Sequence, residues 1–234
     1  MTFARAKICG LTRAEDVDHA IDSGADAVGF IFGYGGSPRN ISFQKLTELI
    51  RRVPPYVSSV VVSPASNPNL ERVAKEARPS FFQLYSETPG NGNGALPDDI
   101  VPSIVINTVH VSSDMTDIES TIERSRNIAK ISRGIILDSP QRKPNGRHSG
   151  HTSLTGGSGV PHDWSASRRI RDALFPFPII LGGGLNSQNV RQAISTVRPF
   201  AVDVSSGVES MPGIKDKAKV AEFITRVKSS QFDY

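Results

Sequence analysis

Eight short apolar runs, separated by stretches long enough for a helix, constrain the fold of this chain more than any other feature. They are rich in Val, Ile and Phe and lie at 5–9, 25–32, 58–63, 80–85, 101–109, 133–139, 177–183 and 200–206. Several runs are continuous rather than alternating, which is typical of strands covered on both faces in a parallel sheet.

Helical patterns fill most of the gaps between these runs, at 12–24, 42–53, 67–77, 114–131, 165–175, 186–197 and 214–230. The first helix is expected to begin at a Thr12 cap, with Glu15 completing a capping box, and to end at Gly24. Eight strands alternating with helices predict a (β/α)₈ TIM barrel, typically about 250 residues long. We expect a single α/β domain over residues 1–234.

A doubly wound open sheet is the alternative architecture. The barrel is favoured because the strand count reaches eight and because no G-x-G-x-x-G motif follows the first strand. Two segments depart from the regular pattern. Residues 86–100 are rich in Gly, Asn and Pro, so the fourth helix is expected to be short or absent. Residues 140–162 lack periodicity and predict a long loop after the sixth strand, either a lid or an insertion.

The composition is that of an ordinary globular protein, with 38% hydrophobic and 21% charged residues. Neither a signal peptide nor an apolar run of about 20 residues is present, which predicts a soluble, cytoplasmic protein with no membrane partner. The single cysteine excludes an internal disulfide. The net charge is +4, but no aromatic residues interleave with the densest basic group, at 141–148, so no nucleic-acid partner is expected. A mild positive balance suits an anionic substrate.

A barrel carries its active site at the carboxyl ends of its strands. That rule gathers Lys7 and Cys9 from the first strand, Asp138 from the sixth and Asp203 from the eighth, with Arg39 in the loop after the second. These ionisable side chains are therefore the candidate site residues.

Two glycine-bearing turns follow the seventh and eighth strands, and they contain Gly183 and Gly184, then Ser205, Ser206 and Gly207. Glycine lets the backbone approach an oxyanion, and free N–H groups at a helix start attract it. Barrels of this kind often hold phosphate at these two loops. The alternative, that the glycines only form tight turns, is less favoured because the two turns occur together.

Each candidate side chain can be interpreted either as a structural residue or as a functional one. Cys9 is either a small buried apolar residue or a base whose pKa nearby Lys7 lowers, a hypothesis that the pH dependence of thiol alkylation tests. Asp138, at the end of an apolar strand, suits a general acid of raised pKa, or else caps a helix or pairs with Arg142. Arg39 could clamp a carboxylate, although a solvated loop charge is the better reading from composition alone.

Three histidines, His148, His151 and His162, fall in the predicted long loop. No helix or strand frame aims them at a metal ion, so they are interpreted as loop residues and no metal site is expected.

Taken together, these segments resemble the phosphoribosylanthranilate isomerase family of tryptophan biosynthesis along nearly the whole chain. The matching segments are KICGLT (7–12), GADAVGFIF (24–32), SPRNIS (37–42), ILD (136–138), GGSG with DW (156–164), GGGLNSQNV (182–190) and RPFAVDVSSGVES (198–210). The pairing of KICG with VDVSSGVE at the far end of the chain is the most specific of these signals.

The resemblance implies a (β/α)₈ barrel that carries out an Amadori rearrangement without cofactor or metal. The substrate would be N-(5-phosphoribosyl)anthranilate and the product 1-(2-carboxyphenylamino)-1-deoxyribulose 5-phosphate. By the same resemblance, Cys9 is the general base, Asp138 the general acid, and Arg39 faces the anthranilate carboxylate. Asp203 lies near the substrate amine, Lys7 belongs to the binding site, and the two glycine-bearing turns hold the phosphate.

Some features depart from the family or leave alternatives open. Tyr85 stands where the family usually has a histidine. Another sugar-phosphate barrel enzyme, such as an indoleglycerol-phosphate synthase or a pentose-phosphate epimerase, is one alternative. A catalytically impaired phosphate-binding barrel that acts as a scaffold or regulator is another. The sequence also leaves open a second substrate, the related aminoaldose of histidine biosynthesis, and the choice between monomer and homodimer.

Overall fold

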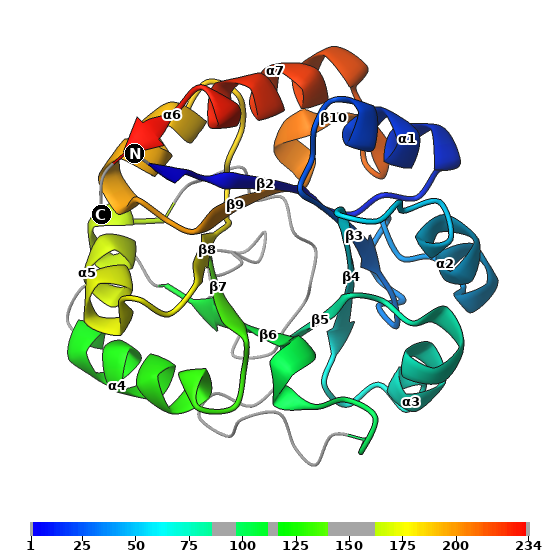
Figure 1. Cartoon of the computed structure of the whole chain (residues 1–234), viewed down its shortest axis with the longest axis horizontal. Helices are drawn as coiled ribbons and strands as arrows, with labels where there is room; N and C mark the ends of the chain where they lie inside the picture. Colours follow the sequence, from blue (N-terminus) through cyan, green and yellow to red (C-terminus); the bar gives the residue numbers. More distant parts are fainter. Residues whose placement is uncertain (1, 86–96, 112–116, 140–161, 233–234) are drawn as a thin grey trace.

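A computed structural model describes residues 2–85, 97–111, 117–139 and 162–232. Its centre is a closed barrel of eight parallel strands, each hydrogen-bonded to the next in chain order (Figure 1). The strands are β2 (Arg5–Ile8), β3 (Ala27–Ile31), β4 (Ser58–Pro64), β5 (Phe81–Tyr85), β6 (Val105–His110), β7 (Gly134–Asp138), β8 (Ile179–Leu181) and β9 (Ala201–Val204). The first and last of these, β2 and β9, pair in register from Arg5 opposite Ala201 to Ile8 opposite Val204, which closes the barrel.

Helices form a ring around the barrel (Figure 1). They are α1 (Ala14–Asp22), α2 (Phe43–Ile50), α3 (Leu70–Arg72) continued by the π-helix η1 (Val73–Ala77), α4 (Ile118–Ala129), α5 (Trp164–Leu174), α6 (Val190–Val197) and α7 (Lys217–Lys228). Two short 3₁₀ helices, η2 (Pro102–Ile104) and η4 (Ser206–Val208), complete the helical elements used below. The predicted (β/α)₈ barrel is confirmed, and the open sheet is excluded because β2 pairs with β9.

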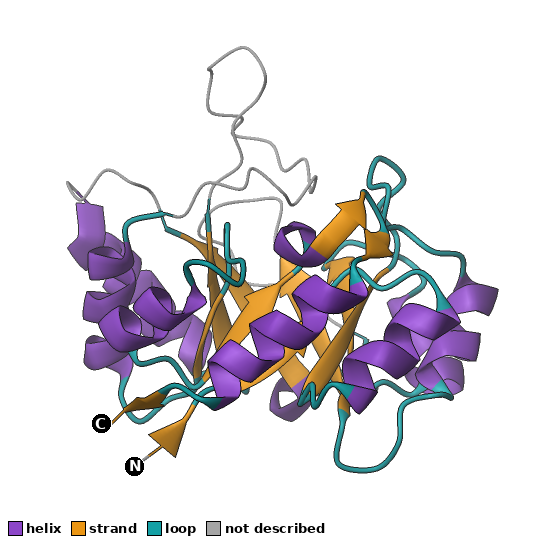
Figure 2. Cartoon of the chain, turned by 90° about the horizontal axis from the view of Figure 1, so that it is seen from above, coloured by secondary structure: helices purple, strands orange, loops and turns teal. Residues whose placement is uncertain are grey.

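Four short strands were not predicted. β1 (Thr2–Phe3) pairs antiparallel with β12 (Gln231–Phe232), and β10 (Glu209–Met211) pairs antiparallel with β11 (Ile214–Lys215). Because β1 and β12 pair, the two ends of the described chain lie together at one end of the barrel (Figure 2). The β10–β11 hairpin follows the last barrel strand and carries residues of the site described below.

The predicted cap of the first helix was wrong. α1 begins at Ala14 after Arg13, whose side chain makes no capping hydrogen bond. The Thr12 hydroxyl instead donates to the carbonyl oxygen of Gly213 at 2.6 Å. The Thr12 side chain is therefore directed toward the β10–β11 turn rather than toward the first turn of α1.

The weak fourth helix can be checked only in part. Between β5 and β6, residues 86–96 lie outside the described residues, and the remainder contains only the short helix η2. The fifth barrel strand consequently begins at Val105 rather than near residue 101. Of the predicted loop 140–162, residues 140–161 lie outside the described residues, so the choice between a lid and an insertion stays open.

The barrel interior changes character along its axis. A cluster of Ile106, Ile136, Ile180 and Ala201 fills the end where the strands begin. Polar side chains follow toward the carboxyl ends, where Lys7 is only 4% exposed. A charged group buried in this layer requires partners. Because the layer lies toward the carboxyl ends of the strands, the active site is expected there.

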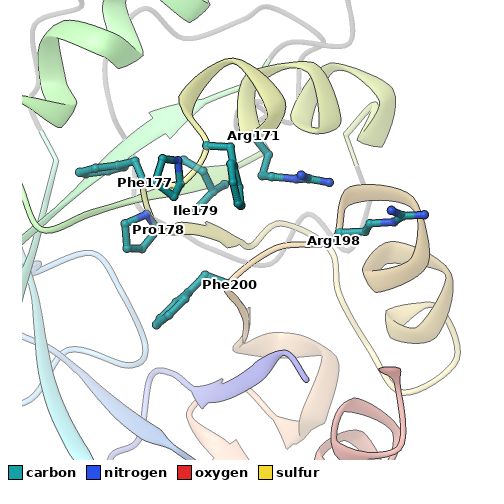
Figure 3. Close-up of a pocket in the computed structure, with 8 residues that line it drawn as sticks. Arg171, Phe177, Pro178, Ile179, Arg198 and Phe200 are labelled. Carbon is teal, nitrogen blue, oxygen red and sulfur yellow. The ribbon is translucent and has the colours of Figure 1, made fainter. Parts of the chain in front are cut away.

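A cavity of about 220 Å³ lies at the opposite end of the barrel, where β8 and β9 begin (Figure 3). It is lined by Arg171, Phe175, Pro176, Phe177, Pro178, Ile179, Arg198 and Phe200. Because its walls come from α5 and from the segments that lead into β8 and β9, this cavity is separate from the candidate site. Among the described residues, no helix combines the length and apolar character needed to cross a membrane.

Candidate active site

A buried ion pair occupies the polar layer of the barrel. Lys7 on β2 and Asp203 on β9 are register partners, and the Lys7 ammonium donates to Asp203 Oδ1 at 2.8 Å. It also donates to Gln83 Oε1, on β5, at 2.9 Å. Burial alone would lower the pKa of Lys7, but the carboxylate of Asp203 and the thiol of Cys9 raise it above its ordinary value. Lys7 is therefore a fixed positive charge inside the barrel.

Cys9 follows β2 directly, and its backbone N–H donates to the carbonyl oxygen of Val204 at 2.8 Å. The side chain is 4% exposed and forms a small buried cluster with Val62 and Tyr85. Space for the sulfur exists because β3 carries Gly29 opposite it: a Cβ at that position would lie 2.8 Å from Sγ. The thiol is thus held between packed neighbours beside Lys7.

Burial raises the pKa of the Cys9 thiol above 9.0, although Lys7 acts in the opposite direction. Asp203 adds to the upward shift and Lys215 opposes it. Lys7 lowers the pKa of the thiol, as predicted. The net pKa is nevertheless raised, because the cost of burying a thiolate outweighs the attraction of the ammonium charge.

This upward shift predicts that alkylation of Cys9 by iodoacetamide reaches its half-maximal rate above pH 9.0. The measurement is unambiguous because the chain has one cysteine. In a Lys7→Met variant the midpoint is expected to move further up, since an opposing charge has gone. A midpoint below that of an ordinary thiol would show that burial does not dominate this site.

The predicted effect of Gly29→Ala follows from the same packing. The added methyl group would crowd Cys9 Sγ and approach Lys7 Cε to 3.1 Å. Overpacking of this kind costs about 1–3 kcal/mol of stability, and here it also displaces the thiol, so both the melting temperature and kcat are expected to fall. Gly35→Ala is the control, because nothing lies within 4 Å of a Cβ there. Equal melting temperatures and equal kcat values for Gly29→Ala and Gly35→Ala would contradict the steric argument.

Asp138 ends β7, and its Oδ1 accepts a hydrogen bond from the Ser139 backbone N–H at 2.8 Å. Burial raises the pKa of Asp138 from 3.8 to about 6, and Asp203 adds to the shift. The Ser139 N–H and Lys7 act against it. Lys7 and Asp203 therefore influence both the thiol and this carboxyl. The predicted rise in the pKa of Asp138 through desolvation is confirmed.

Gly183 packs directly against the carboxyl. Its φ of +78° is unfavourable for other residues, and a Cβ there would lie 2.9 Å from Asp138 Oδ1 and 2.6 Å from Ser139 N. Within the described residues, the backbone N–H groups of Gly183 and Gly184 donate to no protein acceptor. These donors suit an anion beside Asp138.

The loop after β9 supplies the other side of the candidate anion site. At Gly207 the backbone lies against the carbonyl oxygen of Leu185, so this loop contacts the loop after β8. Ser205 Oγ is buried and has no hydrogen-bond partner among the described residues. A Cβ at Gly10 would lie 2.8 Å from that oxygen and 2.6 Å from Arg39 Cδ. The Cys9 loop, Arg39 and the loop after β9 therefore meet at one point.

Arg39 is buried and ion-paired rather than solvated, which corrects the reading from composition. Its guanidinium donates to Glu209 through Nε at 2.8 Å and through Nη2 at 2.6 Å. The Lys215 ammonium donates to Glu209 Oε1 at 2.8 Å and to the Ser205 carbonyl oxygen at 3.0 Å. Burial opposes ionisation of Glu209, but Arg39 and Lys215 outweigh it and lower the pKa of Glu209. Two cations thus share one carboxylate next to the candidate anion site.

Comparison with known proteins identifies the family. Residues 6–226 match the family model for N-(5'-phosphoribosyl)anthranilate (PRA) isomerase. The chain belongs to the N-(5'-phosphoribosyl)anthranilate isomerase family. The N-(5'-phosphoribosyl)anthranilate isomerase of Dechloromonas aromatica is 36% identical over 228 residues, which are 97% of each chain. That of Halobacterium salinarum is 35% identical over 97% of each chain.

Solved structures give the same family. Phosphoribosylanthranilate isomerase from Thermotoga maritima superposes with a TM-score of 0.74 at 37% identity, covering 96% of this chain and 98% of that one. The match covers nearly the whole of both chains, so this chain is an isomerase with the family's barrel. The resemblance seen in the sequence is therefore confirmed, whereas the roles of single residues stay predictions.

Several residues that hold the candidate site in place were not predicted from the sequence. Gln83, Glu209 and Lys215 hold predicted site residues in place. No local pattern points to Gln83, and the turn-forming pair Pro212-Gly213 is the signal that lies between Glu209 and Lys215. Tyr85, in place of the family's usual histidine, is 2% exposed and packs beside Cys9, with its ring centroid 5.3 Å from that of Tyr34. It contributes to the apolar surroundings that keep the thiol pKa high.

His162 lies in the loop before α5, as predicted, but its side chain is buried. Its ring nitrogens lie 3.1 Å from Ser139 Oγ and 2.6 Å from Ser167 Oγ. Burial lowers the pKa of His162 to about 4, with Asp163 acting against the shift. The ring is therefore neutral near pH 7. His148 and His151 lie outside the described residues.

Proposed function

We propose that this chain converts N-(5'-phosphoribosyl)anthranilate to 1-(o-carboxyphenylamino)-1-deoxyribulose 5-phosphate in tryptophan biosynthesis, with Asp138 as general acid and Cys9 as general base. The observation that carries the proposal is a buried carboxyl of raised pKa in the same barrel as a buried thiol, with Lys7 and Asp203 acting on both. A related isomerase, 35% identical with a TM-score of 0.72, was solved in complex with the reduced form of this product.

The acid acts first in this proposal. A protonated Asp138 donates to the ribose ring oxygen, and the ring opens to an iminium ion. Cys9 as thiolate then removes the C2′ proton, and the resulting enolamine tautomerises to the ketone. Each proton transfer by a positioned side chain contributes about 10²–10⁴-fold to the rate.

The pKa values of the two groups decide which protonation state dominates before substrate binds. Near pH 7, Asp138 with its pKa of about 6 is mostly ionised, while the thiol, with its pKa raised above 9.0, is protonated. The catalytic state places that one proton on Asp138 instead, so it is a minor tautomer with the same total charge. We expect kcat/KM to be level between the two pKa values and to fall outside them.

Binding is proposed to follow the charges around this pair. The phosphate lies at the N–H groups of Gly183 and Gly184 and at Ser205, Ser206 and Gly207. The anthranilate carboxylate faces the cluster of Arg39, Glu209 and Lys215, whose formal charges sum to +1. Asp203 lies near the substrate amine, where a carboxylate stabilises the iminium ion.

The molecule is proposed to be a cytoplasmic monomer or homodimer formed from one barrel domain over residues 1–234. The isomerase from Thermotoga maritima is described as dimeric and was also solved as monomers. No cofactor or metal ion is proposed to take part.

The test is direct. Purified protein is mixed with phosphoribosylanthranilate made in situ, and the loss of anthranilate-type fluorescence is followed. Turnover that persists in EDTA is the expected result. Binding of the reduced product without turnover would contradict the proposal and favour a non-catalytic, ligand-binding barrel.

A further inference from the structure

A chain of buried polar contacts links Asp138 to a side chain that enters from the start of α5. His162 lies two residues before Trp164, and it is 7% exposed. One ring nitrogen, Nδ1, lies 3.1 Å from Ser139 Oγ. Ser139 follows Asp138 directly and donates its backbone N–H to Asp138 Oδ1 at 2.8 Å. The imidazole is thus one residue removed from the carboxyl.

We propose that His162 is a positioning residue for the acid: through Nδ1 it holds Ser139 so that the Ser139 N–H stays on Asp138 Oδ1. The proposal rests on the role of Asp138 proposed above. It adds a residue that precedes α5 to the site, and it assigns Ser139 the task of linking that residue to Asp138.

The second ring nitrogen explains why the imidazole itself stays in place. Nε2 lies 2.6 Å from the hydroxyl of Ser167, which is fully buried in the first turns of α5. A neutral imidazole has one N–H and one lone pair, so it donates to one hydroxyl and accepts from the other. The histidine therefore bridges a rigid helix to the residue after the barrel strand.

Ser139 is held on its other side by the loop after β8, which carries Gly183. Gly183 lies so close that a Cβ would overlap Ser139 Oγ and reach 2.6 Å from Ser139 N. The serine therefore sits between His162, Gly183 and Asp138. Loss of the His162 contact would leave its hydroxyl without its link to α5 and loosen the N–H bond to the acid.

Other charges near Asp138 set the background for this effect. Asp203 on β9 raises the pKa of Asp138, and Lys7 on β2 lowers it. His110 on β6 is the register partner of Asp138. Burial and Arg124 on α4 lower the pKa of this ring, against a hydrogen bond with the Ser139 backbone, so the ring is neutral near pH 7. Asp163 is the charged group that acts on His162 itself. These groups are unchanged by the substitutions used in the test.

Two substitutions at position 162 separate a positioning role from a purely structural one. The amide of His162→Asn reaches the position of Nδ1 and can keep the contact with Ser139, whereas that of His162→Gln reaches the position of Nε2 and can keep only Ser167. The N–H bond favours the carboxylate form. In His162→Gln this N–H bond is expected to weaken. The pH below which kcat/KM falls should then rise by about 1 unit, the size expected when a hydrogen bond to a carboxylate weakens.

In His162→Asn, kcat/KM is expected to fall at the same low pH as in the unsubstituted protein. Titration of the substrate phosphate cancels, because each protein is assayed with the same substrate. Equal shifts in both variants, or no shift in either, would overturn the proposal. An unsubstituted protein without turnover would instead refute the proposed function and not this inference.

A second route does not depend on the folding of the histidine variants. Ser139→Ala removes only the hydroxyl and keeps the backbone N–H. It is therefore expected to raise the pH below which kcat/KM falls by the same amount as His162→Gln. The double variant Ser139→Ala/His162→Gln should show no further shift, because both changes break one link. Additive shifts would mean that His162 acts on the site by another path. Melting temperatures of all variants are measured alongside as the control for stability.

Discussion

Replacing Asp138 with Asn is expected to lower kcat by about 10²–10⁴-fold, the range that general acid catalysis contributes. The amide has nearly the same shape, and its oxygen can still accept the Ser139 N–H that lies 2.8 Å from Asp138 Oδ1. It has no acidic proton for the ribose ring oxygen. The loss should therefore appear in kcat, with little change in the melting temperature.

The matched control is Asp18→Asn, at a carboxylate that is 42% exposed and pairs with Arg52 on the surface. It is expected to leave kcat unchanged. Cys9→Ala should reduce kcat by a similar factor to Asp138→Asn. Because one reaction needs both groups, the double variant should be little worse than either single one. Retention of more than about a tenth of the activity by Asp138→Asn would argue against its role as the acid.

The barrel could be predicted because its signals are local. Continuous apolar runs such as the one ending at Asp138 are what buried parallel strands require, and barrel geometry then places their carboxyl ends together. Lys7 and Asp203, which are 196 positions apart, become hydrogen-bonded partners because β2 and β9 close the sheet. The geometry of the barrel therefore predicts that residues far apart in the sequence lie close together, although no local pattern connects them.

The partners of Arg39 could not be predicted in the same way. Its contact with Glu209 spans 170 positions and depends on the β10–β11 hairpin, which lies outside the alternating pattern. A signal was present, since Pro212-Gly213 between Met211 and Ile214 is a turn-forming pair. The same turn explains the missed cap of α1, because the Gly213 carbonyl oxygen accepts the hydroxyl of Thr12.

Glu209→Gln is expected to destabilise the fold by about 3–5 kcal/mol at pH 7, the cost of removing one partner from a buried ion pair. Arg39 and Lys215 would remain buried against a neutral amide, with their like charges unbalanced. The side chains of Arg39 and Glu209 are each 5% exposed and that of Lys215 is 2% exposed, so water cannot replace the lost charge. Chemical denaturation of the two proteins measures the difference.

The pH dependence of this difference identifies its cause. Arg39 and Lys215 lower the pKa of Glu209 below 4.5 in the folded protein, so the stability that its charge contributes is fully present above the unfolded pKa. It is lost as the pH falls through the lowered, folded value. The difference between the unsubstituted protein and Glu209→Gln should therefore be constant at neutral pH and shrink as the pH falls below 4.5. Glu48→Gln, at an exposed carboxylate that pairs with Lys45, should cost less than about 1 kcal/mol. A difference that persists unchanged at low pH would mean that packing, rather than charge, makes Glu209 necessary.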